Sequence, residues 1–182
     1  MLHHHYFSTG ATRSRESFSK QLDRFLKSSD YSKKEVVFLC IGSDRATGDS
    51  LGPILGYKLK NCGLKGIFVY GTLEDPVHAQ NLKKTLCKIY RKHHDCLIIA
   101  VDASLGEQKH IGYVTLSNHS IQPGIGVQKS LPCAGDISIT GIVNCSCECS
   151  TALLQTTRLQ IVVKIADFLL EGILGSKLAA RQ

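Results

Sequence analysis

The sequence lacks any long apolar run, and this absence excludes the simplest kind of membrane protein. The hydrophobic stretches among its 182 residues are well short of the roughly 20 apolar residues that a transmembrane helix needs. The first residues, MLHHHYFSTGATRSRESFSK, also lack the apolar core of a secretory signal peptide. We therefore expect a cytoplasmic protein that has no membrane partner.

Two nucleotide-binding signatures are missing as well. The glycine-bearing segment GSDRATGDSLGP joins a predicted strand to a predicted helix, as phosphate-binding loops do. No Gly-Lys-Ser or Gly-Lys-Thr follows it, however, and its glycines do not match the dinucleotide-binding pattern GxGxxG. An acidic residue at the helix entrance would also repel phosphate from the site that the helix dipole favours. The sequence therefore does not favour a nucleotide-binding protein.

The formal net charge of +7 raises the question of an acidic partner. Many of the basic residues lie in one segment, 79–94, whose apolar residues recur at helical spacing. This segment carries no interleaved aromatic residues for base stacking, and the chain has no recognisable nucleic-acid-binding motif. The charges are best explained as the solvated face of a docked helix, so nucleic acid is not an expected partner.

The eight cysteines do not indicate a disulfide framework, because the chain is long and carries no secretory signal. Three of them, Cys145, Cys147 and Cys149, alternate along one segment. Three sulfurs without an obvious fourth ligand make a poor structural zinc site. Ordinary reduced thiols are the simpler interpretation, and the sequence leaves their redox state open.

The elements that are present predict an α/β protein. The apolar runs at 36–41 (VVFLCI) and 96–101 (CLIIAV) are unbroken, which is typical of strands covered on both faces in a parallel sheet. A third apolar run at 67–70 lies between them, and helical patterns at 50–61 and 79–94 separate the three runs. Because parallel crossovers are right-handed, this βαβαβ series places helices on both faces of the sheet.

The rest of the chain completes the predicted fold. Apolar runs at 111–116 and 137–143 have shorter connections, which favours an antiparallel strand at one edge. The segment 153–174 predicts one long helix, and 13–26 predicts an amphipathic helix. We expect a three-layer αβα sandwich of the phosphorylase/hydrolase-like kind, with a mostly parallel twisted sheet and an antiparallel edge. The expected division is an N-terminal segment 1–34, whose first 12 residues are predicted to be disordered, an α/β domain 35–175, and a tail 176–182.

Two aspartates, Asp49 and Asp102, each lie where a predicted buried strand ends. In open α/β sheets, ligands bind beyond the carboxyl ends of the strands, where the strand order reverses, so the two acids could share one cleft. Paired carboxyl groups are a common means of hydrolysis. Each acid also has a simpler explanation: Asp49 as the N-cap of the following helix, and Asp102 as a residue that orients a loop.

A family resemblance rests on several ordered segments. TGDSLGP (47–53) resembles the TPDALGP segment of the bacterial spore germination protease, and VVFLCIGSDRATGDSLGP as a whole resembles the related YyaC-type sporulation proteins. IIAVDAS, which ends just beyond Asp102, is similar to the strand that delivers the second essential aspartate of the protease, and PGIGV (123–127) is similar to its PGSGV loop. GTLEDPVHAQNL and LLQTTRLQIVVKIADFL also resemble YyaC-type sequence, which extends the similarity close to the C terminus.

The resemblance implies a fold shared with hydrogenase maturation endopeptidases and an atypical aspartic-type peptidase whose catalytic acids are Asp49 and Asp102. The matched loops supply the expected substrate-binding residues: Ser43, Asp44, Pro123, Gly124 and Gly126. The expected substrate is a peptide or a small spore protein, in the cytoplasm of a sporulating cell or forespore. The chain departs from the protease at Gly48 and Gln128, where the protease has proline and glycine, so the fit of the substrate can differ.

Three alternatives stay open at this point. No cofactor is expected, but hydrogenase maturation proteases hold nickel with two acids and a histidine. The resemblance therefore leaves room for nickel or another divalent metal on Asp49, Asp102 and either His78 or His119. A second alternative is a non-catalytic sporulation factor that binds a peptide or protein in the same cleft. The third is assembly into a homo-oligomer, which the sequence does not decide.

Overall fold

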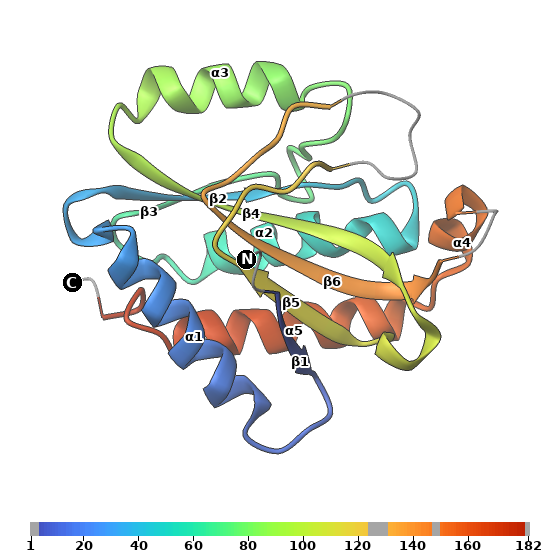
Figure 1. Ribbon diagram of the computed structural model, residues 1–182. Helices are drawn as coiled ribbons and strands as arrows, with labels where there is room; N and C mark the ends of the chain where they lie inside the picture. Colours follow the sequence, from blue (N-terminus) through green and yellow to red (C-terminus); the bar gives the residue numbers. More distant parts are fainter. Residues whose placement is uncertain (1–3, 124–130, 147–149, 181–182) are drawn as a thin grey trace.

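The computed structural model describes residues 4–123, 131–146 and 150–180. A six-stranded sheet lies between two layers of helices (Figure 1). The strands are β1 (His5–Ser8), β2 (Glu35–Cys40), β3 (Ile67–Tyr70), β4 (Cys96–Gly106), β5 (Tyr113–Ser117) and β6 (Ile137–Cys145). The helices are α1 (Ser14–Ser28), α2 (Leu51–Asn61), α3 (Leu82–Lys92), α4 (Ser150–Thr156) and α5 (Leu159–Leu174).

The strand order is β1-β5-β6-β4-β2-β3. Strands β3, β2, β4 and β6 are parallel to one another, whereas β5 pairs antiparallel with both β6 and β1. The antiparallel pairings therefore lie at one side of a mostly parallel sheet. This topology confirms the predicted three-layer αβα fold class.

Alternate side chains of the central strands face two different cores. Along β2, Val36 and Phe38 pack with α1, α2 and α5, whereas Val37 and Leu39 pack with α3. All four side chains are fully buried. This two-sided burial is the reason that the run at 36–41 is apolar without alternation.

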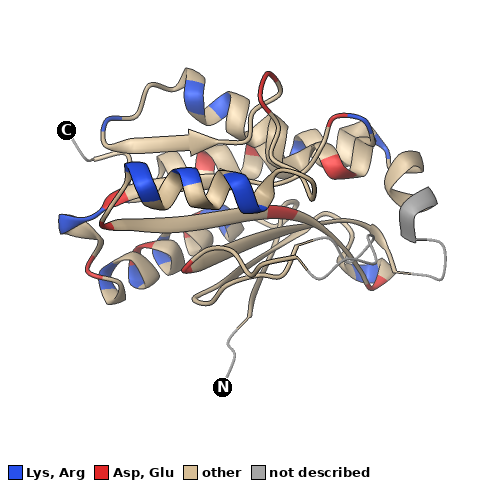
Figure 2. Cartoon of the chain, turned by 90° about the horizontal axis from the view of Figure 1, so that it is seen from above, with Lys and Arg blue, Asp and Glu red and all other residues tan. Residues whose placement is uncertain are grey.

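Helix α3 is docked through one apolar stripe. Its Leu82, Leu86 and Ile89 are buried, whereas its lysines and arginine are exposed. Figure 2 shows basic positions spread along this helix. The predicted solvated basic face is thereby confirmed. Among residues 4–123, 131–146 and 150–180, no helix is long and apolar enough to cross a membrane.

The predicted disorder of the first 12 residues is wrong for the part of that segment that the structure describes. His5–Ser8 forms β1, which pairs with β5 at the edge of the sheet. Phe7 is buried and its ring lies 5.4 Å from that of Phe18 on α1. Because Phe7 and Phe18 belong to the same core as α2 and α5, a boundary at residue 34 does not coincide with a break in the packing.

Two further elements differ from the sequence prediction. Strand β4 continues past Asp102 to Gly106, so Asp102 lies within the strand and not at its end. The single helix expected at 153–174 is two helices, α4 and α5, separated at Thr157 and Arg158. At this break the Thr157 hydroxyl donates to the Leu153 carbonyl and accepts from Asn144 Nδ2, while Arg158 has an extended backbone.

Candidate active site

The connection between β2 and α2 is folded back on itself at a glycine. Gly42 has a φ of +140°, a conformation that side-chain-bearing residues rarely adopt, and a Cβ at this position would overlap the backbone oxygen of Asp49. The amide of Ser43 donates to that same oxygen at 3.0 Å. The glycine thus allows Asp49 to lie against the carboxyl end of β2.

Asp49 is not a helix cap. It lies within a 3₁₀ turn, Thr47–Ser50, whose N-cap is Ala46, and the N-cap of α2 is Ser50. The capping interpretation of this residue is therefore wrong. Instead, the Asp49 carboxyl is largely buried and lies near the backbone amide of Ser43.

Asp102 enters the site from the neighbouring strand β4. Strand side chains alternate between the two faces, so Asp102 lies on the same face as Ala100 and Ile98, which belong to the core under α3. Its side chain is only 9% exposed, and the amide of Ala103 donates to Oδ1 at 2.9 Å. Asp102 therefore carries a buried carboxyl group at the C-terminal part of the parallel sheet.

The two carboxyl groups influence each other. Burial raises the pKa of Asp49 to about 6, although the Ser43 amide opposes this shift. Burial also raises the pKa of Asp102 well above its ordinary value, and the negative charge of Asp49 raises it further. Desolvation and the nearby negative charge both favour the protonated form of Asp102. The charge of Asp49 therefore acts on the carboxyl group of Asp102.

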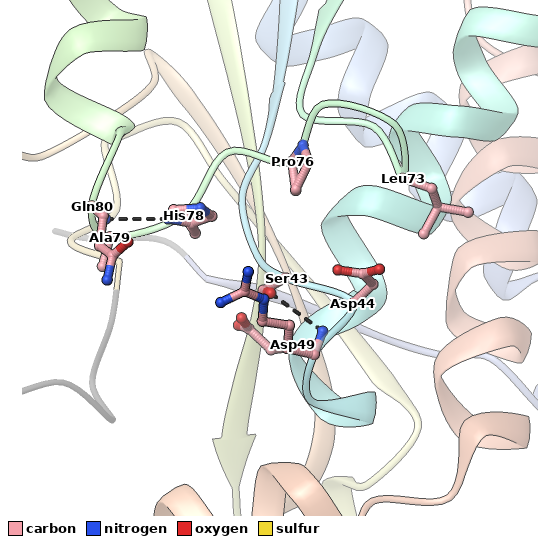
Figure 3. Close-up of a pocket in the computed structure, with 9 residues that line it drawn as sticks. Ser43, Asp44, Asp49, Leu73, Pro76, His78, Ala79 and Gln80 are labelled. Carbon is pink, nitrogen blue, oxygen red and sulfur yellow. Dashed lines mark hydrogen bonds between the residues drawn. The ribbon is translucent and has the colours of Figure 1, made fainter.

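Asp49 opens into a cleft of about 610 Å³, which we call the aspartate cleft. It is lined by Ser43, Asp44, Arg45, Asp49, Leu73, Pro76, His78, Ala79 and Gln80. Figure 3 shows that these residues come from two connections that face each other, β2–α2 and β3–α3. A backbone bridge between Ile41 and Val77, and a bond from the Gly42 amide to the Val77 carbonyl at 2.7 Å, hold the two connections together.

The substrate-binding residues expected from the sequence fall into three groups. Ser43 and Asp44 line the aspartate cleft. Pro123 is buried and is not among the residues that line the cleft. Gly124 and Gly126 lie outside the described residues.

Sequence reasoning missed most of the wall formed by the β3–α3 connection. Leu73, Pro76 and Gln80 line this wall, although the sequence assigned them no role. A usable signal was the position of their segment, GTLEDPVHAQNL, directly after β3. Strand β3 lies beside β2, and the carboxyl ends of neighbouring parallel strands open on the same edge of a sheet.

The two histidines considered as metal ligands lie in different places. His78 lines the aspartate cleft, and its Nδ1 accepts a hydrogen bond from the Gln80 amide. His119 packs edge-on against His4, with ring centroids 4.9 Å apart. Within the described residues, no three or more His, Cys, Asp or Glu side chains are gathered so as to hold a metal ion. The mechanism below uses the two carboxyl groups alone.

The clustered cysteines are described only in part. Cys145 ends β6 and is partly exposed as a free thiol, whereas Cys147 and Cys149 lie outside the described residues. Cys40, inside β2, is fully buried, and burial raises the pKa of its thiol to about 12. Cys40 is therefore a core residue and not a nucleophile.

Comparison with known proteins places the chain in a family. A family model described as "Protein of unknown function (DUF1256)" matches residues 8–172, and the chain belongs to this family. It is 46% identical over 157 residues to the uncharacterized protein YyaC of Bacillus subtilis (strain 168), a match that covers 85% of this chain and 77% of YyaC. The resemblance to YyaC-type proteins is therefore confirmed.

A solved structure is also similar. It is the [NiFe] hydrogenase maturation protease HycI from Thermococcus kodakarensis KOD1, which is 14% identical in sequence. The alignment covers 85% of this chain and 99% of HycI, with a TM-score of 0.44.

Proposed function

We propose that this protein is a peptidase that hydrolyses peptide bonds with Asp49 and Asp102 as a coupled acid/base pair. The observation that carries the proposal is the partly buried carboxyl group of Asp49 beside β2 and the buried carboxyl group of Asp102 on the adjacent parallel strand β4, where the charge of Asp49 raises the pKa of Asp102. Coupled carboxyl groups with separated pKa values are a recurrent arrangement in hydrolases. The aspartate cleft beside them is large enough for several residues of a polypeptide.

The pKa shifts suggest which acid takes which role. Near pH 7, Asp49 is mostly ionised because its pKa is about 6. Asp102 is the more buried of the two acids, and the charge on Asp49 further disfavours its ionised form, so Asp102 stays protonated. We therefore assign Asp49 as the general base and Asp102 as the general acid.

The proposed reaction adds one water molecule across the peptide bond. The Asp49 carboxylate takes a proton from water, whose oxygen attacks the carbonyl carbon, while Asp102 gives its proton to the carbonyl oxygen. The C–N bond then breaks as Asp49 returns its proton to the leaving nitrogen. Asp102 recovers its proton when the new carboxyl group forms, and both side chains return to their starting states.

Substitution of each aspartate by asparagine tests the proposal. Asp49→Asn and Asp102→Asn keep the size of the side chain but can neither take up nor deliver a proton, so we expect peptide hydrolysis to fall at least about 100-fold. Asp95→Asn is the matched control, because Asp95 is an exposed aspartate that does not line the aspartate cleft. We expect this control to retain most of the activity.

The measurement is mass spectrometry of a peptide library and of spore protein extracts after incubation with each protein. Products that appear with wild type and Asp95→Asn but not with the other two variants support the proposal. If wild type gives no product, or if Asp49→Asn cleaves as well as wild type, the peptidase function is contradicted. Saturable binding without any product would instead indicate the non-catalytic peptide-binding factor considered above.

A further inference from the structure

One half of the sheet face that carries α3 has no helix over it among the described residues. The core under α3 contains residues of β2 and β4 but none of β1, β5 or β6. In Figures 1 and 2, α3 lies over β2 and β4, and β5 and β1 extend beyond it. A sheet face that is permanently covered in a three-layer fold is normally apolar.

Most of the side chains on this half are polar. They line a groove of about 780 Å³ together with Leu105, Ile121 and Ile142, and its hydroxyl-bearing residues are Tyr6, Ser104, Thr115, Ser117, Ser138, Thr140 and Ser146. We call it the hydroxyl groove. Thr115, Ser117 and Ser138 are less than 9% exposed and form its floor. Hydroxyl groups at such depth need hydrogen-bond partners, which a bound ligand can supply.

The strand register connects the hydroxyl groove to Asp102. Asp102 lies opposite Thr140 on β6, Thr140 lies opposite Thr115 on β5, and Thr115 lies opposite Tyr6 on β1. These four residues form one row across four strands, on one face of the sheet. Asp102 is the inner end of the row, and the other three residues line the groove. The proposed general acid and the groove are thus neighbours on the same surface.

The hydroxyls of the row and of the groove floor are hydrogen-bonded but not saturated. Thr115 Oγ1 and Thr140 Oγ1 are 2.6 Å apart, and on the floor Ser117 Oγ is 2.7 Å from His4 Nδ1. A hydroxyl offers one donor and two acceptor positions, so each of these groups keeps capacity for a further bond. The acid on the rim, Glu107, pairs with Lys109.

We infer that the hydroxyl groove binds the part of the polypeptide substrate that lies on one side of the scissile bond, in extended form and across the strands. The inference rests on the proposed peptidase function. Three strand spacings of about 4.8 Å separate Asp102 from Tyr6, a span of about four extended residues. The groove selects segments rich in glycine, serine, asparagine and other small or uncharged polar residues, because large apolar side chains would leave its hydroxyls unpaired.

Binding is tested apart from cleavage. Isotope-labelled Asp102→Asn protein, which is expected to be catalytically silent, is titrated with a capped hexapeptide of glycine, serine and asparagine and followed by NMR. We expect saturable shift changes at the groove residues. We expect the affinity to fall about tenfold or more in a background that also carries Thr115→Val and Thr140→Val, which remove two hydroxyls at nearly constant shape.

Matched controls make the result specific. Thr85→Val places the same substitution on α3, outside the groove, and we expect it to leave the affinity unchanged. A hexapeptide of alanine, leucine and valine is the ligand control, and we expect it to bind more weakly. If the double threonine variant unfolds, Ser138→Ala in the groove floor replaces it.

The outcomes separate this inference from the proposed function. Cleavage of peptides by wild type with no groove shifts, or with unchanged affinity in the threonine variants, overturns the inference but leaves the peptidase function standing. Equal or tighter binding of the apolar hexapeptide also overturns it. Groove binding by a protein that cleaves nothing contradicts the peptidase function while supporting the groove as a peptide site.

Discussion

Asp44 and Asp49 carry the same side chain and lie in the same loop, but their surroundings differ. Asp44 is exposed, whereas Asp49 is largely buried beside a second acid on β4. Water stabilises the charge of the first carboxylate, and burial withdraws that stabilisation from the second. Environment, and not residue type, thus distinguishes a proton-transferring acid from an ordinary surface charge.

The raised pKa of Asp49 predicts how stability depends on pH. Between about pH 4 and 6 the native state keeps a proton that the unfolded chain has lost, so the free energy of unfolding declines as pH rises through this window. Asp49→Asn removes the ionisation. We therefore expect this variant to gain about 3 kcal/mol relative to wild type between pH 4 and pH 7.

Urea denaturation at a series of pH values measures this difference. Asp44→Asn provides the baseline, and we expect its stability to follow that of wild type at every pH. A difference between Asp49→Asn and wild type that stays constant from pH 4 to pH 7 would show that the Asp49 carboxyl is not desolvated.

At the scale of elements, a buried histidine anchors the end of α3 to the sheet. His93 is 2% exposed; its Nδ1 lies 2.5 Å from a carboxylate oxygen of Glu35, and its Nε2 lies 3.0 Å from the Tyr70 hydroxyl. The carboxylate can only accept, so Nδ1 donates to it, and in the neutral imidazole the Tyr70 hydroxyl donates to Nε2. The network ties α3 to both β2 and β3.

Removal of one hydroxyl tests this anchor. Tyr70→Phe leaves Nε2 of His93 buried without its partner, and we expect a loss of about 1–3 kcal/mol in the free energy of unfolding. Tyr90→Phe on α3 is the control, because Tyr90 is 58% exposed and should change stability by less than about 0.5 kcal/mol. Equal unfolding midpoints in urea for the two variants would contradict the role of this network.

The elements also show which signals a sequence carries. The run at 36–41 and the basic helix were predictable because burial on two faces leaves an unbroken apolar run and burial of one stripe leaves a helical period. Strand β1, HYFS, was not, since it is short and places a single side chain, Phe7, in the core. No proline or glycine marks the break at Thr157. The Thr157 side chain bonds with Leu153 and Asn144, and the bond with Asn144 depends on the tertiary structure, so no local sequence pattern shows it.

Some features of the candidate site were likewise predictable from the sequence, and others were not. The convergence of Asp49 and Asp102 followed from strand order, which the βαβ pattern predicts. Their desolvation, the second wall of the aspartate cleft and the row from Asp102 to Tyr6 depend on packing and register between distant segments. A single sequence holds no local pattern for these features.

At the scale of the whole molecule, β1 forms one edge of the sheet and links it to the helices. Phe7 on β1 packs against Phe18, which in turn lies 5.8 Å from the ring of Phe168 on α5, so one aromatic cluster joins the first strand to the last helix. We expect Phe7→Ala to lower the free energy of unfolding by about 3 kcal/mol or more through the cavity it leaves.

The neighbouring residue on the same strand provides the control for Phe7. Tyr6 faces the opposite side of the sheet and is 53% exposed, so we expect Tyr6→Ala to cost less than about 1 kcal/mol. Thermal and urea unfolding of the two variants measure the comparison. A similar loss in both would indicate that β1 is held by its backbone pairing and not by the aromatic cluster.

His4 and Tyr6, from the segment around β1, line the hydroxyl groove. This has a practical consequence for recombinant work. A tag or fusion partner inserted immediately before His4 would lie beside the groove, where it would compete with a ligand for the same surface. Purification handles for assays of this protein are therefore better joined after α5.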